Sequence, residues 1–158
     1  MSEKYLVPTA FKIISGGQTG ADRAGLDWAL GHSLPHGGWC PRGRRSEEGT
    51  IDRQYQLTET PTDRYLQRTE WNVRDSDATL IFTLAEQLDG GSKKTADFAN
   101  KQGKPWKHVY PGLDPKFVVS FLSRNRVKTL NIAGKRESSA PGVSKWVTEI
   151  LDLVLQIE

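Results

Sequence analysis

The residues best suited to binding a ligand are glycines and small polar side chains in three short stretches. These are residues 16–20 (GGQTG), residues 90–95 (GGSKKT) and residues 134–138 (GKRES). Glycine lets a ligand approach the backbone closely, and the first N–H groups of a helix favour an anion such as a phosphate. The first stretch matches neither G-x-G-x-x-G nor a P-loop. Taken alone, it fits an anion site and a tight turn without a ligand equally well.

A second candidate is the charged segment that contains Arg42, Arg44 and Arg45. Guanidinium groups can hold a phosphate or another oxyanion in bidentate fashion. Residues 37–60 show little periodicity, and a loop of this length in a compact domain is often functional. The alternative is a solvated loop in which the arginines pair with Glu47 and Glu48.

Further polar residues lie next to these stretches. Asp22 and Arg23 follow the first glycine turn, where a carboxylate is also favoured simply by the helix dipole. Arg68, Glu70 and Asn72 lie on a predicted helix over residues 62–77. Their alternative role is a solvated helix surface.

Strands and helices alternate along the chain. Apolar runs predict strands at residues 11–14, 78–84, 106–110 and 127–133, and helical patterns begin near residues 21, 62, 92, 114 and 143, with Ser92 as an N-cap candidate. This order predicts an α/β domain with a mostly parallel sheet. Each glycine stretch directly follows a predicted strand, and the carboxyl ends of parallel strands meet at one edge. We therefore expect the three stretches to converge on one anion site.

The composition fits a soluble globular protein. The chain has 158 residues, 36% of them hydrophobic and 26% charged, and a formal net charge of +3. We expect residues 1–10 to form a lead-in with little regular structure and residues 11–158 to form a single domain. The mild positive charge suits a small anion and does not favour nucleic acid. One cysteine excludes an internal disulfide, and the apolar runs are too short for a membrane span or signal peptide. We expect a cytoplasmic protein.

Five motifs carry a resemblance to a known family. They are SGGQTGADR, WCPRGRR, RTEWNVRDSDATLIF, DGG followed by Thr95, and NIAGKRES. The sequence resembles the molybdenum carrier family and is similar to molybdenum cofactor carrier proteins. This family belongs to a superfamily with the "lonely guy" phosphoribohydrolases and the DNA-processing protein DprA. In the last motif, which contains the third glycine stretch, Lys135 stands where the family usually has proline.

The resemblance implies a Rossmann-like, doubly wound sheet with helices on both faces, and a homo-oligomer. It also implies binding of a phosphorylated pterin that carries molybdenum, the molybdenum cofactor (molybdopterin). Molybdoenzymes or cofactor-synthesis proteins would be partners. The first two glycine loops would hold the phosphate, and Arg42, Arg44 and Arg45 would contact other anionic groups. The complete predicted site comprises Gly16, Gly17, Gln18, Thr19, Gly20, Asp22, Arg23, Arg42, Arg44, Arg45, Arg68, Glu70, Asn72, Gly90, Gly91, Ser92, Thr95, Gly134, Arg136 and Ser138.

Two alternatives to a carrier stay open. One is a nucleotide-binding enzyme, such as a nucleoside-monophosphate phosphoribohydrolase, and the other is a nucleotide-sensing regulatory module. The hydrolase signature PGGxGTxxE is incomplete in DGGSKKT, so Glu70 or Asp97 would have to replace its glutamate. We assign no catalytic residue and, because the histidines are scattered, no metal ligand. We also expect Gly17→Asp to abolish ligand binding with little loss of fold.

Overall fold

The computed structural model describes residues 3–158, which fold around a five-stranded sheet with the strand order β3-β2-β10-β8-β9. The strands are β2 (Lys12–Ile14), β3 (His36–Gly37), β8 (Ala78–Phe82), β9 (Trp106–Val109) and β10 (Thr129–Gly134). All neighbouring pairs are parallel, and central Leu130 lies opposite both Ile13 and Ala78. The predicted α/β fold with a parallel sheet is confirmed.

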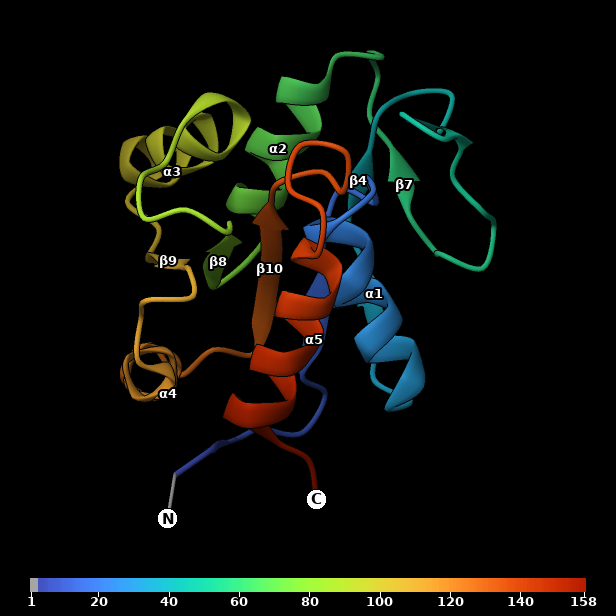
Figure 1. Cartoon of the computed structure of the whole chain (residues 1–158). Helices are drawn as coiled ribbons and strands as arrows, with labels where there is room; N and C mark the ends of the chain where they lie inside the picture. Colours follow the sequence, from blue (N-terminus) through green and yellow to red (C-terminus); the bar gives the residue numbers. More distant parts are fainter. Residues whose placement is uncertain (1–2) are drawn as a thin grey trace.

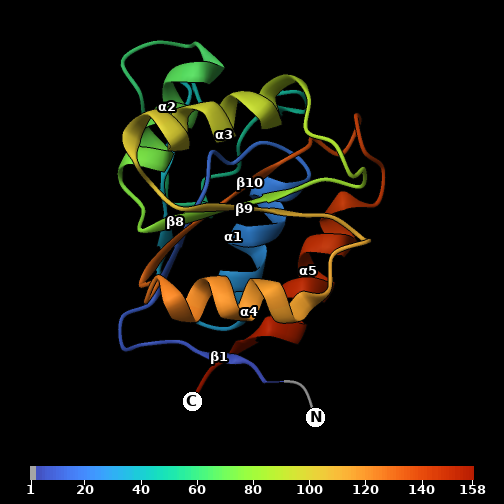
Figure 2. The ribbon, with the colours of Figure 1, turned by 90° about the vertical axis from the view of Figure 1, so that its left-hand side faces the viewer.

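Helices cover both faces of this sheet (Figure 2). They are α1 (Ala21–Gly31), α2 (Tyr65–Arg74), α3 (Gly90–Gln102), α4 (Pro115–Arg124) and α5 (Val143–Val154). α1, α4 and α5 pack on one face, and α2 and α3 pack on the other. β8 is buried along its whole length, as its continuous apolar run predicts for a strand covered on both sides.

A glycine lets α1 lie close to the sheet. A Cβ atom at Gly25 would lie 2.8 Å from the Cβ atom of Ile132 in β10. This contact explains why a helix interior contains a glycine, which costs roughly 1 kcal/mol relative to alanine. Because the position of α1 is fixed against β10, the turn before α1 is also held at the edge of the sheet.

Several predicted boundaries differ from the structure, most of them by one or two residues. The lead-in contains β1 (Tyr5–Leu6), which pairs with β11 (Leu155–Gln156) beyond the last helix. α2 begins at Tyr65 rather than near residue 62. Ser92 is not the N-cap of α3, because Asp89 occupies that position and Ser92 lies in the first turn. The Ser92 hydroxyl therefore does not cap the backbone at the start of α3.

The segment between β3 and α2 forms a small unit beside α1. It contains β4 (Trp39–Cys40) paired with β7 (Thr58–Glu59), and a hairpin of β5 (Arg45–Ser46) and β6 (Gly49–Thr50). Its apolar side chains form a second core with one residue of α1; this core consists of Leu26, Cys40, Ile51 and Tyr55. The unit lies at the same end of the molecule as the loops that follow β2, β8 and β10 (Figure 1).

The first described residues and the C-terminus lie at the opposite end, below α5 in Figure 1. Within residues 3–158, no helix has the length and apolar character needed to cross a bilayer.

Candidate functional site

The three glycine stretches and α2 enclose one cavity of about 350 Å³ at the carboxyl edge of the sheet. Its lining residues are Gln18, Asp22, Tyr65, Leu66, Arg68, Thr69, Gly90, Gly91, Ser92, Thr95, Ala133, Gly134, Lys135, Arg136 and Ser139. The volume is in the range of small-molecule sites, roughly 300–1,000 Å³. A larger cavity of about 500 Å³ lies beside α4 and includes Phe117 and Leu153, but none of the glycine stretches. The edge cavity is therefore the candidate site.

The first glycine turn uses several of its N–H groups within the protein. Gly17 N donates to Ser15 Oγ at 3.3 Å, and Gln18 N donates to Asp22 Oδ2 at 3.3 Å. Ala21 N, at the start of α1, donates to the carbonyl of Lys135 at 3.0 Å. A carboxylate of the chain thus already occupies part of the position that the sequence suggested for a ligand anion.

At the N-terminus of α3, the described residues show no hydrogen bond between the cap and a side chain. Lys93 N donates to the Asp89 carbonyl, so the N–H groups of Gly91 and Ser92 precede the hydrogen-bond ladder of the helix. The Ser92 side chain is 3% exposed and its hydroxyl has no partner. A Cβ atom at Gly91 would meet nothing within 4 Å. Packing does not require glycine there, whereas a ligand close to the backbone would.

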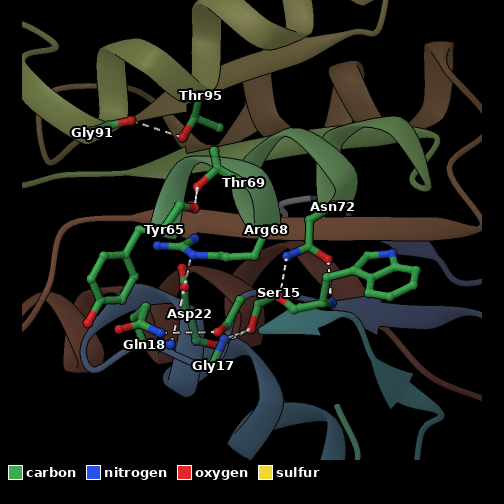
Figure 3. A network of polar contacts seen from close by, with 12 residues as sticks. Ser15, Gly17, Gln18, Asp22, Tyr65, Arg68, Thr69, Asn72, Gly91 and Thr95 are labelled. Carbon is green, nitrogen blue, oxygen red and sulfur yellow. Dashed lines mark hydrogen bonds and ion pairs between the residues drawn. The ribbon is translucent and has the colours of Figure 1, made fainter. Parts of the chain in front are cut away.

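A buried ion pair lies between these two ends of the cavity (Figure 3). Arg68 Nη1 from α2 lies 3.4 Å from Asp22 Oδ2, and Arg68 Nε has no partner. Burial raises the pKa of the Asp22 carboxyl above its ordinary value and lowers the pKa of Arg68. Each charge therefore loses more by leaving water than it regains from the other. An added anion would offset part of the uncompensated charge on Arg68.

Gly16 makes room for this arginine. A Cβ atom at Gly16 would lie 2.6 Å from Arg68 Nη1 and 2.7 Å from its Cδ. Any larger residue would push the guanidinium group away from the first turn. Gly20 has a similar role toward the third turn, because its φ is +81° and a Cβ atom would lie 2.4 Å from the Lys135 carbonyl oxygen. These glycines bring the separate turns into contact.

Arginines surround Tyr65 at one side of the cavity. The guanidinium carbons of Arg136, Arg45 and Arg68 lie 4.6, 5.7 and 5.9 Å from the centre of its ring. Arg45 pairs with Asp63 at 3.2 Å and Arg68 with Asp22. In residues 3–158, Arg136 has no carboxylate within ion-pair distance. This excess of positive charge favours an anionic guest.

Several predicted site residues face away from the cavity. Arg44 donates to the carbonyls of residues 51, 52, 55 and 57, so it organises its own loop. Arg42 donates to the Pro61 carbonyl. Asn72 joins α2 to β4 by two hydrogen bonds with the backbone of Trp39. Glu70, which the hydrolase reading needs, does not line the cavity, and neither does Asp97.

Arg23 and Gly17 contact the small unit beside α1. Arg23 donates to the Gly17 carbonyl at 2.9 Å and lies over the Tyr55 ring. Gly17 has φ +73°, and a Cβ atom there would lie 2.5 Å from Leu57 Cδ1. The expectation that Gly17→Asp preserves the fold stays a prediction, and the positive φ and the contact with Leu57 indicate that the variant would be destabilised.

Glu47 binds two other residues of the predicted site, Thr19 and Ser138. Its carboxylate accepts hydrogen bonds from the hydroxyls of Thr19 and Ser138, and these bonds lower its pKa. In the described residues, Arg42, Arg44 and Arg45 do not pair with Glu47 or Glu48, so that alternative is wrong. Glu48 lies 3.9 Å from Arg23, and Glu47 connects the first and third turns to the hairpin. Thr19 and Ser138 thus position loops at the rim.

The sequence interpretation missed six lining residues, which are Tyr65, Leu66, Thr69, Ala133, Lys135 and Ser139. Lys135 forms an ion pair with Asp89, which joins the third glycine turn to the N-cap of α3. Asp89 directly precedes Gly90, and Lys135 directly follows Gly134. Their positions next to the glycines of the motifs were the signal in the sequence that could have placed them at the site. Tyr65 had none beyond its position on the predicted helix. In residues 3–158, no three histidine, cysteine, aspartate or glutamate side chains are grouped for metal binding.

A parallel α/β sheet with a basic cavity at its carboxyl edge defines a Rossmann-like ligand-binding domain. The profile of the circularly permutated YpsA SLOG family matches residues 13–155, and the chain belongs to this family. It is also similar to the crystal structure, at 1.45 Å resolution, of a protein from Syntrophus aciditrophicus SB named "Putative molybdenum carrier protein". The two are 42% identical with a TM-score of 0.87, and the match covers 92% of this chain and 95% of that chain.

Among curated proteins, none matches the chain significantly. The predicted relation to molybdenum carrier proteins is confirmed by the structural neighbour, and together with the family it supports a ligand-binding function.

Proposed function

We propose that this chain binds a phosphorylated small molecule in the edge cavity, with the phosphate at the N-terminus of α3. The observation that carries the proposal is the buried, unpartnered hydroxyl of Ser92 at the start of a 13-residue helix. The nearby N–H groups, the helix dipole and the unpaired charge of Arg136 all favour a phosphate there. Gly91 leaves the space through which the phosphate approaches the backbone.

We propose the molybdenum cofactor as the cargo, with the protein acting as a carrier or store. The structural neighbour is named as a molybdenum carrier, and that name is the support for this finer identity. The cavity lining contains hydrogen-bond donors and one carboxylate, Asp22, but no cysteine or histidine. The protein would therefore hold the cargo by its phosphate and polar groups and not by direct bonds to the metal. Molybdoenzymes and cofactor-synthesis proteins are the proposed partners, and a homo-oligomer stays a prediction.

The proposal is tested by loading the full-length protein with molybdopterin under anoxic conditions. The protein is then separated by gel filtration, and bound pterin is oxidised to its fluorescent form and measured. We expect pterin to elute with the wild-type protein and about tenfold less with Arg136→Ala, because a charge-assisted hydrogen bond is lost. Lys93→Ala is the matched control, since this lysine is a cation on α3 that does not line the cavity.

Pterin that elutes equally with both variants would contradict the assigned phosphate position. A complete lack of bound pterin would contradict the carrier function. In a parallel incubation with nucleoside monophosphates, chromatography should show no released base. Released base would instead support the hydrolase alternative, with Asp22 as the carboxyl group that lines the cavity.

A further inference from the structure

The amide of Gln18 has a fixed orientation in the cavity. Its Nε2 donates to the carbonyl of Arg45 at 2.8 Å, with the carbonyl of Gly16 at 3.5 Å. The reverse orientation would place the amide oxygen against these carbonyl oxygens, which cannot donate. Oε1 is therefore the atom without a partner, in a side chain from a residue that is 2% exposed and lines the cavity. A buried acceptor of this kind needs a donor, which a ligand in the cavity can supply.

Arg68 provides the complementary group. Its Nε is also buried without a partner, and it can only donate. The same carboxylate oxygen, Asp22 Oδ2, accepts from Gln18 N and from Arg68 Nη1, so it anchors both residues (Figure 3). The cavity therefore holds one unsatisfied acceptor and one unsatisfied donor on residues that share an anchor.

We infer that Gln18 and Arg68 recognise a polar edge in which an N–H donor lies beside a carbonyl acceptor, as in the lactam of a heterocyclic ring. This inference rests on the proposed function, in which the phosphate of the same ligand lies at Ser92. A fully deprotonated oxyanion such as molybdate offers only acceptors and leaves Gln18 Oε1 unpaired at neutral pH. The preferred ligand class is consequently a phosphate ester of a lactam-containing heterocycle.

The experiment measures the contribution of the heterocycle to binding by isothermal titration calorimetry. Inosine 5′-monophosphate contains one lactam edge, ribose 5-phosphate lacks the base, and inorganic phosphate lacks both base and sugar. We expect the wild-type protein to bind inosine monophosphate about tenfold more tightly than ribose 5-phosphate, as one or two hydrogen bonds to buried groups would give. In Gln18→Leu, this advantage should fall to less than about threefold, with the affinity for ribose 5-phosphate unchanged.

Two comparisons separate recognition from structural damage. Gln18→Leu also loses the bond to Arg45, and Ser46→Ala loosens the same hairpin by removing the bond to the Gly49 carbonyl, while the glycine turns keep their contacts. Ser46→Ala should keep the advantage of inosine monophosphate. If Gln18→Leu does not fold, 1-methylinosine 5′-monophosphate is titrated into the wild-type protein, because it lacks the ring N–H and should lose the advantage.

Equal affinities of the wild-type protein for inosine monophosphate and ribose 5-phosphate would overturn this inference and leave the phosphate site in place. The same holds if Gln18→Leu weakens both ligands equally. If no phosphate ester binds, the proposed function fails as well.

Discussion

Replacement of Gly91 by alanine separates the stability of the helix from the binding of a ligand. Gly91 lies in the first turn of α3, and its new methyl group would meet no protein atom within 4 Å. Glycine costs up to about 1 kcal/mol relative to alanine inside a helix, and less near its end. We expect Gly91→Ala to raise the free energy of unfolding by about 0.5 kcal/mol.

The same methyl group should weaken phosphate binding. It would be added to a residue that lines the cavity, next to the N–H groups of Gly91 and Ser92. A phosphate displaced from these donors loses at least one charge-assisted hydrogen bond, worth about 1.5–3 kcal/mol, or roughly tenfold or more in affinity. The variant should therefore be more stable and bind less well, which a purely structural role for Gly91 does not predict.

Urea denaturation gives the stability, and calorimetric titration with ribose 5-phosphate gives the affinity. Gly31→Ala is the matched control, because Gly31 ends α1, far from the cavity lining, and also has open space around its Cβ position. It should change stability slightly and binding not at all. Unchanged affinity in Gly91→Ala would refute the placement of the phosphate at α3. A loss of stability would show that the position tolerates less than its open surroundings indicate.

Three further predictions concern charged groups. Asp22→Asn keeps an acceptor for Gln18 N but removes a negative charge from the cavity, and it should raise phosphate affinity about fivefold in low-salt calorimetry, roughly 1 kcal/mol after screening by solvent. Unchanged affinity would mean that Asp22 does not face the anion. Glu137→Ala should lower the free energy of unfolding in urea by about 1–2 kcal/mol, because its carboxylate caps α5 at Gly142 N, 2.7 Å away; no loss would contradict that cap. The pKa of Glu47 lies below its ordinary 4.5, so its stabilisation is complete above pH 4.5 and is lost as the pH falls through the lower folded-state value. Protection factors of residues 44–53 against hydrogen exchange should fall in that range for the wild-type protein, and a similar fall in Glu47→Gln would disprove the assignment.

The architecture could be predicted because it depends on patterns that are local in the sequence. The continuous apolar run of β8 indicated a central parallel strand, and that strand is fully buried. Each glycine stretch follows a strand, and topology alone then places the stretches at one edge. Gly20 and Gly134 indeed bring their turns into contact with distant backbone.

The roles of individual polar residues depend on long-range contacts that the sequence does not show. Arg44 looked like an anion ligand, but its guanidinium group satisfies carbonyls of its own loop. Asn72 lies on the helix that also provides Arg68, yet it faces β4 and not the cavity. The meaning of Glu47 depends on hydroxyls from residues 19 and 138, which are far from it in the chain. Residue types indicated the chemistry available, and packing determined where each group was used.

The first glycine turn shows how an anion-binding motif can be redirected by one side chain. Asp22 accepts a hydrogen bond from Gln18 N and pairs with Arg68, so its carboxylate does there what a bound anion does elsewhere. A second negative group at that position would be repelled, and the free helix end at Gly91 and Ser92 is the remaining place for a phosphate. The turn before α1 is then left to position Gln18. On this argument, the two ends of the cavity select different parts of one ligand, its phosphate and its ring edge.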